Sequence, residues 1–265
     1  MRSVIYLGLA CALVAASCGG QPSRSGNTTR PSGLPGSARP SVTATVSPAG
    51  PTPHASDDFG RTVDNGWGGA TVGGGWTLAG TAADFHVTGT AGTMALPASR
   101  AYRAAFLNTI SVTDVDLTFR VATSKTAAGG PQYIYSAVRR VSAGNFYRVT
   151  MRIEPNGKVF VGASTVIDNT ETGIGSEVRV AQMIHGADAF IRLRAQLSGT
   201  SPTSIRVRAW ADGATEPSSW QYTATNSTAS LQVAGEVGLE SYLSRPTTNA
   251  PVIVTFDDYL ATGVA

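Results

Sequence analysis

Asn145–Glu154 reads NFYRVTMRIE, and this stretch decides the fold. Apolar side chains occupy every second position of one face, namely Tyr147, Val149, Met151 and Ile153. Because side chains along a β-strand alternate between two faces, the pattern predicts a strand with one buried face. A Pro155-Asn156-Gly157 turn follows, and Asn-Gly between two alternating runs is a strong hairpin signal. The stretch therefore predicts an antiparallel hairpin.

The same alternation continues on both sides of this hairpin. Phe190–Leu197 and Ser204–Trp210 each place apolar residues opposite arginines. We expect further strands at 76–79, 84–88, 93–96, 103–110, 114–121, 132–140, 158–163, 219–224, 236–243 and 251–260. No segment of useful length shows a helical period. About thirteen short strands at this spacing predict an all-β fold with two antiparallel sheets packed as a sandwich.

The charge of the chain argues against a nucleic-acid partner. Only 14% of the 265 residues are charged, and the net charge is +3. Four arginines (Arg2, Arg24, Arg30 and Arg39) precede residue 56, where there is no acidic residue, so the rest of the chain is nearly neutral. Binding to nucleic acid requires clustered Lys and Arg that replace phosphate counterions. We therefore expect no nucleic-acid partner.

Residues 1–18 read MRSVIYLGLACALVAASC and predict a signal peptide. One arginine precedes an apolar run that is too short to span a bilayer, and small residues lead to Cys18. This ending resembles a bacterial lipobox, which implies a lipid on Cys18 and a membrane anchor on the extracytoplasmic side. The alternative is ordinary cleavage and secretion. The only other cysteine, Cys11, lies inside the apolar run, so we expect no disulfide in the mature protein.

Two regions follow the signal peptide. Residues 19–55 are rich in Pro, Ser, Thr and Gly and contain almost no large apolar residue. Such a composition cannot bury enough surface to fold, so we expect a disordered linker. From residue 56 aromatic residues and strand periodicity begin, which predicts one folded domain over 56–265.

The two ends of this domain carry short sequence motifs that resemble those of a known family. It opens with Asp57-Asp58-Phe59-Gly60-Arg61 and Gly73-Gly74-Gly75-Trp76-Thr77, and it closes with Phe256-Asp257-Asp258-Tyr259. Over about residues 56–262 the chain resembles the concanavalin A-like lectin/glucanase (LamG-like) modules in secreted proteins of high-GC Gram-positive bacteria. The resemblance implies a jelly-roll sandwich, carbohydrate recognition and a structural calcium ion.

The residues also bear on catalysis. The glucanase branch of the resembled fold carries a Glu-x-Asp-x-x-Glu strand, and this chain has no such run. Glu171 and Glu177 lie in the turn-rich segment TETGIGSE rather than on one strand. Hydrolysis of a glycosidic bond requires two carboxylates that flank it. We therefore expect a non-catalytic module, with a glycoside hydrolase or lyase that uses an unrecognised site as the alternative.

Two aspartate pairs are candidates for a calcium site. Asp57 and Asp58 lie near the first strand, and Asp257 and Asp258 lie near the last. The ends of a jelly roll are commonly neighbours, and crowded carboxylates repel one another unless a cation neutralises them. The alternative is that these aspartates cap turns or pair with Arg61.

Candidate ligand-binding residues come from polar strand faces that carry aromatic side chains. They are Tyr133, Tyr135, Arg148, Arg206, Arg208 and Trp210. On an exposed sheet face, aromatic rings can stack on sugars while arginines bond to hydroxyl or acidic groups. The alternative is a solvated sheet surface or a face covered by loops.

Together these features predict a membrane-anchored extracytoplasmic lipoprotein whose sandwich domain binds a polysaccharide or other glycan without cleaving it. The remaining alternative is a structural or protein-interaction module of the cell envelope.

Overall fold

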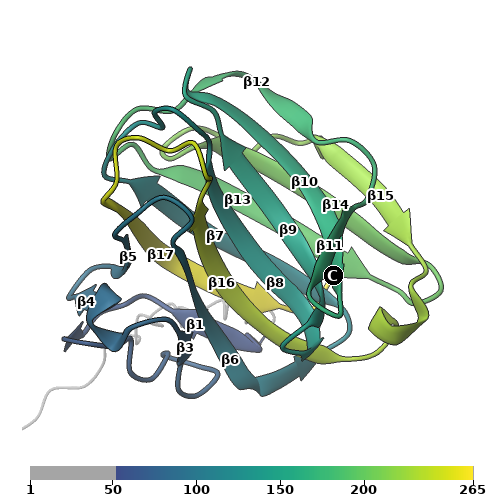
Figure 1. Ribbon diagram of the computed structural model, residues 1–265. Helices are drawn as coiled ribbons and strands as arrows, with labels where there is room; N and C mark the ends of the chain where they lie inside the picture. The colour runs from purple at the N-terminus through teal and green to yellow at the C-terminus, as the bar shows by residue number, and fades with distance from the viewer. Residues whose placement is uncertain (1–51, 265) are drawn as a thin grey trace, which may run out of the picture. The chain divides into compact units, whose positions relative to one another are not determined.

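The computed structural model describes residues 52–264, and these residues form two antiparallel sheets packed face to face (Figure 1). The all-β sandwich expected from the sequence is confirmed. The signal peptide, Cys18 and most of the expected linker lie outside the described residues. The first strand begins at Ala55. Within residues 52–264, no helix is long and apolar enough to cross a membrane.

The nine-stranded sheet is built from the following strands, in order across the sheet: β15 (Tyr222–Asn226), β14 (Thr203–Ala211), β13 (Ile191–Ser198), β7 (Val115–Thr123), β17 (Val252–Thr262), β5 (Gly92–Leu96), β4 (Phe85–Thr88) and β2 (Thr62–Val63), with β1 (Ala55–Asp57) paired to β17. The last strand of the chain therefore lies between strands from its first half. Because β1 pairs with β17, the two ends of the domain are neighbours, as a jelly roll requires.

The eight-stranded sheet contains β11 (Thr170–Gly173), β10 (Lys158–Ile167), β9 (Asn145–Ile153), β8 (Gln132–Ser142), β16 (Gly235–Leu243), β6 (Tyr102–Val112) and β3 (Thr77–Ala79), with β12 (Val178–Ile184) also paired to β10. Two short 3-10 turns, η1 (Ala82–Asp84) and η2 (Ala229–Leu231), complete the elements of residues 52–264. The expected hairpin is present, because the Gly157 N–H donates to the Glu154 carbonyl at 2.8 Å in the turn between β9 and β10.

The core lies between the sheets and explains the alternation in the sequence. Tyr147, Val149 and Met151 of β9 face inward, as do Val207 and Ala209 of β14, and all are buried. The residues between them must therefore lie on the outer faces. Each sheet consequently has one face that packs against the other sheet and one outer face whose side chains are available to contact a ligand or solvent.

Four strands were not expected, namely β1, β2, β11 and β12. Residues 170–173, which lie in the segment expected to be turn-rich, form β11, and residues 178–184 form β12. Both strands lie at the edge of the eight-stranded sheet, where each pairs only with β10. An edge strand with one neighbour has little buried surface, and most of β12 is exposed. The hydrophobic alternation that marks a central strand is therefore absent.

A cluster of aromatic side chains fills the core near β1. The fully buried Trp67 lies edge-on to Trp76 at 5.2 Å and to Phe59 at 5.3 Å between ring centroids. Its indole N–H donates to the Thr93 carbonyl at 2.9 Å. The backbone of Gly73 runs beside Ala55 with φ +112°, and a Cβ there would lie 3.0 Å from the alanine Cβ. The glycine-rich run therefore allows the chain to turn closely around the two tryptophans.

Candidate functional site

The outer face of the eight-stranded sheet brings together three of the predicted ligand-binding residues. Tyr133 and Tyr135 lie on β8, and Arg148 lies on the adjacent strand β9. Tyr135 is opposite Thr150 and Ala137 is opposite Arg148 in the register, so these side chains share one face. This face is the one turned away from the core that contains Tyr147.

Three tyrosines form a row on this face. The rings of Tyr133 and Tyr135 are stacked, with centroids 5.6 Å apart and an interplanar angle of 20°. Tyr242 of β16 lies 6.0 Å from Tyr133 at 41°. Tyr135 is buried, whereas Tyr133 and Tyr242 are partly exposed. The row therefore presents two accessible rings supported by a third.

Arginines lie over the aromatic rings of the same face. The guanidinium carbon of Arg148 is 4.5 Å from the centre of the Tyr135 ring, and that of Arg152 is 4.4 Å from the centre of the Phe160 ring. Such cation–π contacts hold the arginines flat against the sheet. Their side chains are therefore mostly covered, at 14% exposure for Arg148 and 18% for Arg152.

Each of these arginines is shared between two carboxylates. Arg148 donates to Glu240 at 2.8 Å and to Glu171 at 2.8 Å, and Glu240 is fully buried. Arg152 donates to Glu177 at 2.6 Å and is also paired with Glu154. In both networks two carboxylates therefore face one guanidinium.

A hollow of about 520 Å³ lies above these networks. It is lined by Tyr133, Tyr135, Thr150, Ala163, Ser164, Glu171, Gly173, Gly175, Glu177, Tyr242 and Ser244. A second hollow of about 350 Å³ shares Glu171 with the first and is also lined by Arg148 and Phe146. Both volumes are within the range of small-molecule sites. We call the first hollow the tyrosine pocket.

The pKa values of the two pocket tyrosines and of the adjacent Arg148 are all raised. Burial raises the pKa of Tyr135, and the charge of Glu171 raises it further, against the opposing effect of Arg148. Burial also raises the pKa of Tyr133, where Arg152 opposes the effect and Glu177 and Glu171 add to it. Although burial disfavours the charge on Arg148, the Glu240 carboxylate more than offsets this and raises the pKa of the guanidinium. The phenols thus stay neutral and the arginine stays charged at neutral pH.

The other three predicted ligand-binding residues lie elsewhere. Arg206, Arg208 and Trp210 alternate with core residues on β14, so they occupy the outer face of the nine-stranded sheet, on the opposite side of the sandwich. Arg208 lies 4.2 Å over the Trp220 ring and pairs with Glu216. The six residues therefore form two separate groups rather than one site.

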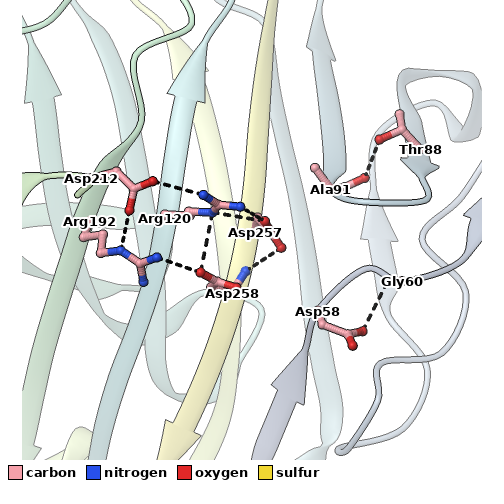
Figure 2. Close-up of polar contacts among 9 residues, drawn as sticks. All are labelled: Asp58, Gly60, Thr88, Ala91, Arg120, Arg192, Asp212, Asp257 and Asp258. Atoms are coloured by element: carbon pink, nitrogen blue, oxygen red, sulfur yellow. Dashed lines mark hydrogen bonds and ion pairs between the residues drawn. The ribbon is translucent and has the colours of Figure 1, made fainter.

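The nine-stranded sheet carries a network of ion pairs across its outer face (Figure 2). Arg120 donates to Asp257 at 2.5 Å and to Asp212 at 3.0 Å, and Arg192 donates to Asp212 at 2.5 Å and to Asp258 at 2.8 Å. A bulge in β17, where Asp258 has φ +52°, brings both aspartates of that strand close to Arg120.

These contacts bear on the predicted calcium site. Asp57, Asp58 and Asp258 line one hollow of about 290 Å³, whereas Asp257 does not line it. The buried Asp57 carboxylate accepts bonds from Arg61 at 2.7 and 2.9 Å, so the alternative pairing with Arg61 is observed. Calcium prefers six to eight oxygen ligands that are free to coordinate it.

Within residues 52–264, no group of three or more His, Cys, Asp or Glu side chains is spaced to hold a metal. The four aspartates as arranged do not fit a calcium ion, because Asp57, Asp257 and Asp258 already face arginines. The structural calcium ion that the sequence analysis expected therefore remains a prediction.

Several residues of the tyrosine pocket were missed in the sequence. Tyr242 alternates with buried residues in the run GLESYL, which is a signal that could have placed it on an outer face. Glu171 reaches the pocket from the edge strand β11 and Glu177 from the loop that precedes β12, and no periodicity marked either residue. No sequence feature predicted the burial of Glu240, because a carboxylate in a strand is normally expected to be exposed.

Neither a protein-family profile nor any curated protein matches the sequence. Solved structures do match the fold. The β-glucanase of Bacillus licheniformis is 9% identical with a TM-score of 0.51, and the alignment covers 83% of this chain and 100% of the enzyme. The metal-free carbohydrate recognition domain of Emp46p is 7% identical with a TM-score of 0.50, covering 72% and 89%. An endo-acting O-glycanase of the human gut microbiota is 10% identical with a TM-score of 0.50, covering 81% and 100%. At these identities the similarities establish the concanavalin A-like sandwich fold and no shared function.

Proposed function

We propose that the domain binds a glycan in the tyrosine pocket, on the outer face of the eight-stranded sheet. The observation that carries the proposal is the row of Tyr133, Tyr135 and Tyr242 at a hollow of about 520 Å³. An aromatic ring offers a flat apolar surface that matches the C–H face of a sugar ring. The hydroxyls of Ser164 and Thr150 and the two glutamates offer hydrogen-bond partners for sugar hydroxyls.

The geometry also supports a ligand longer than one sugar. The second hollow shares the Glu171 side chain with the first, and its lining includes the aromatic residues Tyr102, Phe106 and Phe146. The structures that share the fold include a carbohydrate recognition domain and two glycan-cleaving enzymes, which is consistent with a glycan ligand. The fold alone does not determine the ligand.

The location of the protein is part of the proposal. We propose that residues 1–18 are a lipoprotein signal peptide, that Cys18 carries the lipid, and that residues 19–55 tether the domain on the extracytoplasmic face of the membrane. The setting expected from the resemblance is a high-GC Gram-positive bacterium. Membrane extraction followed by mass spectrometry of the N-terminal residue tests the anchor. A Cys18→Ser variant should then appear in the soluble fraction.

A glycan and polysaccharide panel tests the binding function, followed by titration calorimetry on any ligand retained. Tyr133→Ala and Tyr242→Ala should each weaken the binding about tenfold, because truncating a central aromatic contact typically costs more than 1 kcal/mol. The matched control is Trp220→Ala, which removes a partly exposed ring from the opposite face. Equal losses in the control and the pocket variants would refute the placement of the site.

Catalysis is a second candidate, because Glu171 and Glu177 line the same pocket. Glu171, however, accepts hydrogen bonds on both carboxylate oxygens, from Ser164 at 2.6 Å and Arg148 at 2.8 Å. Both oxygens are therefore already held by donors, whereas a glycosidase requires a carboxyl group that can donate its proton to the leaving group. Release of reducing ends or unsaturated products from a bound polysaccharide, abolished by Glu171→Gln or Glu177→Gln, would establish an enzyme instead.

A further inference from the structure

The tyrosine pocket has an uneven distribution of charge. Its lining includes two acidic side chains, Glu171 and Glu177, and no basic one. The arginines that pair with them, Arg148 and Arg152, lie against aromatic rings and do not line the pocket. A ligand in the pocket therefore meets carboxylates, phenols and hydroxyls directly, and meets the positive charges only through them.

The arginines also leave negative charge uncompensated. Arg148 is shared by Glu171 and Glu240, and Arg152 is shared by Glu154 and Glu177, so four carboxylates face two guanidinium groups. The other basic residues near these segments in the sequence, Lys158, Arg179 and Arg245, are partly or fully exposed and do not line the pocket. At ionic strengths near 0.15 M charges interact over about 8 Å, so the nearest charges to a ligand in the pocket are those of Glu171 and Glu177, which line it.

The exposed parts of the glutamates face solvent where a ligand would enter. Glu171 and Glu177 are 41% and 32% exposed, although each is bonded to an arginine. Carboxylate oxygens have about four lone-pair positions, so each can accept a further donor from a ligand. The accessible rings of Tyr133 and Tyr242 lie in the same pocket, and the face of an aromatic ring attracts cations.

We propose that the tyrosine pocket selects glycans with free ammonium groups, that is, non-acetylated amino sugars, over neutral and anionic glycans. The inference rests on the proposed glycan-binding function and specifies its ligand class. The ammonium group would sit between the carboxylates of Glu171 and Glu177 and the tyrosine rings, while the sugar ring stacks on the aromatic row. Uronate or phosphate groups would meet the carboxylates and be repelled.

The experiment is a calorimetric titration of the protein with four oligosaccharides of equal length. They are a β-1,4-glucosamine hexamer, its N-acetylated counterpart, a neutral cellohexaose and an anionic oligogalacturonate, all at a pH where the amines are protonated. We expect the glucosamine hexamer to bind about tenfold more tightly than the N-acetylated hexamer, as one cation–π contact and one partly exposed ion pair predict. This preference should shrink as the salt concentration rises.

Glu171→Gln and Glu177→Gln are the diagnostic variants, because they remove charge at constant shape. Each should reduce the preference for the ammonium ligand over cellohexaose several-fold, measured as the ratio of the two affinities in the same variant. Glu216→Gln is the matched control, since Glu216 has a similar 34% exposure and also pairs with arginines, but on the opposite face. It should leave both affinities unchanged.

The possible outcomes distinguish a failure of the ligand-class inference from a failure of the proposed glycan-binding function. If neutral and ammonium hexamers bind equally, or if oligogalacturonate binds best, the inference is overturned while glycan binding stands. If the folded protein binds none of the four and retains nothing from the wider panel, the proposed function fails and the inference fails with it. A preference that persists in both glutamine variants would also overturn the inference.

Discussion

Replacing Asp57 by alanine tests how the two ends of the domain are joined. The Asp57 side chain is fully buried, and its carboxylate accepts four hydrogen bonds. The donors are the Phe59 N–H at 3.0 Å, the two terminal nitrogens of Arg61 at 2.7 and 2.9 Å, and the Trp76 indole at 2.7 Å. Because Asp57 belongs to β1, this carboxylate ties the first strand to the aromatic cluster.

The magnitude follows from what the substitution leaves behind. The indole N–H of the buried Trp76 would lose its acceptor, at a cost of about 1–3 kcal/mol. Removing one partner of a buried ion pair costs about 3–5 kcal/mol, but Arg61 is 25% exposed and recovers part of this from water. We expect Asp57→Ala to lower the free energy of unfolding by about 3 kcal/mol, which is about 6–12 °C in the thermal midpoint for a domain of this size.

Urea denaturation followed by tryptophan fluorescence measures the effect, because Trp67 and Trp76 lie beside the substitution. The control is Asp58→Ala, at the next residue, whose side chain is exposed and bonds only to Gly60 and Thr71. The control should lose far less stability, with an unchanged denaturant slope in both variants. A loss below about 1 kcal/mol for Asp57→Ala, or equal losses in the two variants, would refute the reasoning.

Three further predictions concern other parts of the domain. Burial lowers the pKa of His185, so the unfolded chain binds the proton first and stability should fall as the pH drops below about 6.5, by at most about 1.4 kcal/mol per pH unit; this fall should disappear from denaturation curves measured between about pH 7.5 and 5 in His185→Phe. Because the aspartates near β1 and β17 already face arginines, millimolar calcium should not raise the thermal midpoint; a rise that disappears in Asp258→Asn would place an ion there. A Cβ at Gly238 would lie 2.4 Å from an aromatic ring carbon of the adjacent strand, so Gly238→Ala should cost about 1–3 kcal/mol in a thermal melt, whereas Gly69→Ala, with nothing within 4 Å of its Cβ, should cost less.

The sequence predicted the sandwich because its central strands have one buried face. In Asn145–Glu154 the inward residues are apolar and the outward residues are polar or aromatic, so periodicity alone assigned both faces. Tyr133, Tyr135 and Arg148 come together because they lie on adjacent strands of one local meander, β8 and β9. Local order along the chain was therefore sufficient for this part of the site.

The remaining features of the candidate site depend on pairing between segments that are distant in the sequence, so local patterns could not predict them. Which sheet β14 joins is decided by its pairing with β13, so the sequence could not show that Trp210 lies on the far side from Tyr135. Glu171 and Glu177 reach the pocket only because two edge strands fold beside β10. The burial of Glu240 depends on an arginine ninety-two positions away, and no local pattern encodes such a partner.

The ion-pair network on the nine-stranded sheet has a consequence for how the molecule meets its surroundings. Arg120, Arg192, Arg194 and Arg208 are matched there by five carboxylates, so the counterions of these arginines are built into the fold. A surface that supplies its own counterions releases few on contact with a polyanion, and little entropy is gained by adhesion. In a medium crowded with charged polymers this broad face should therefore adsorb few polyanions, whereas the tyrosine pocket lies on the opposite sheet.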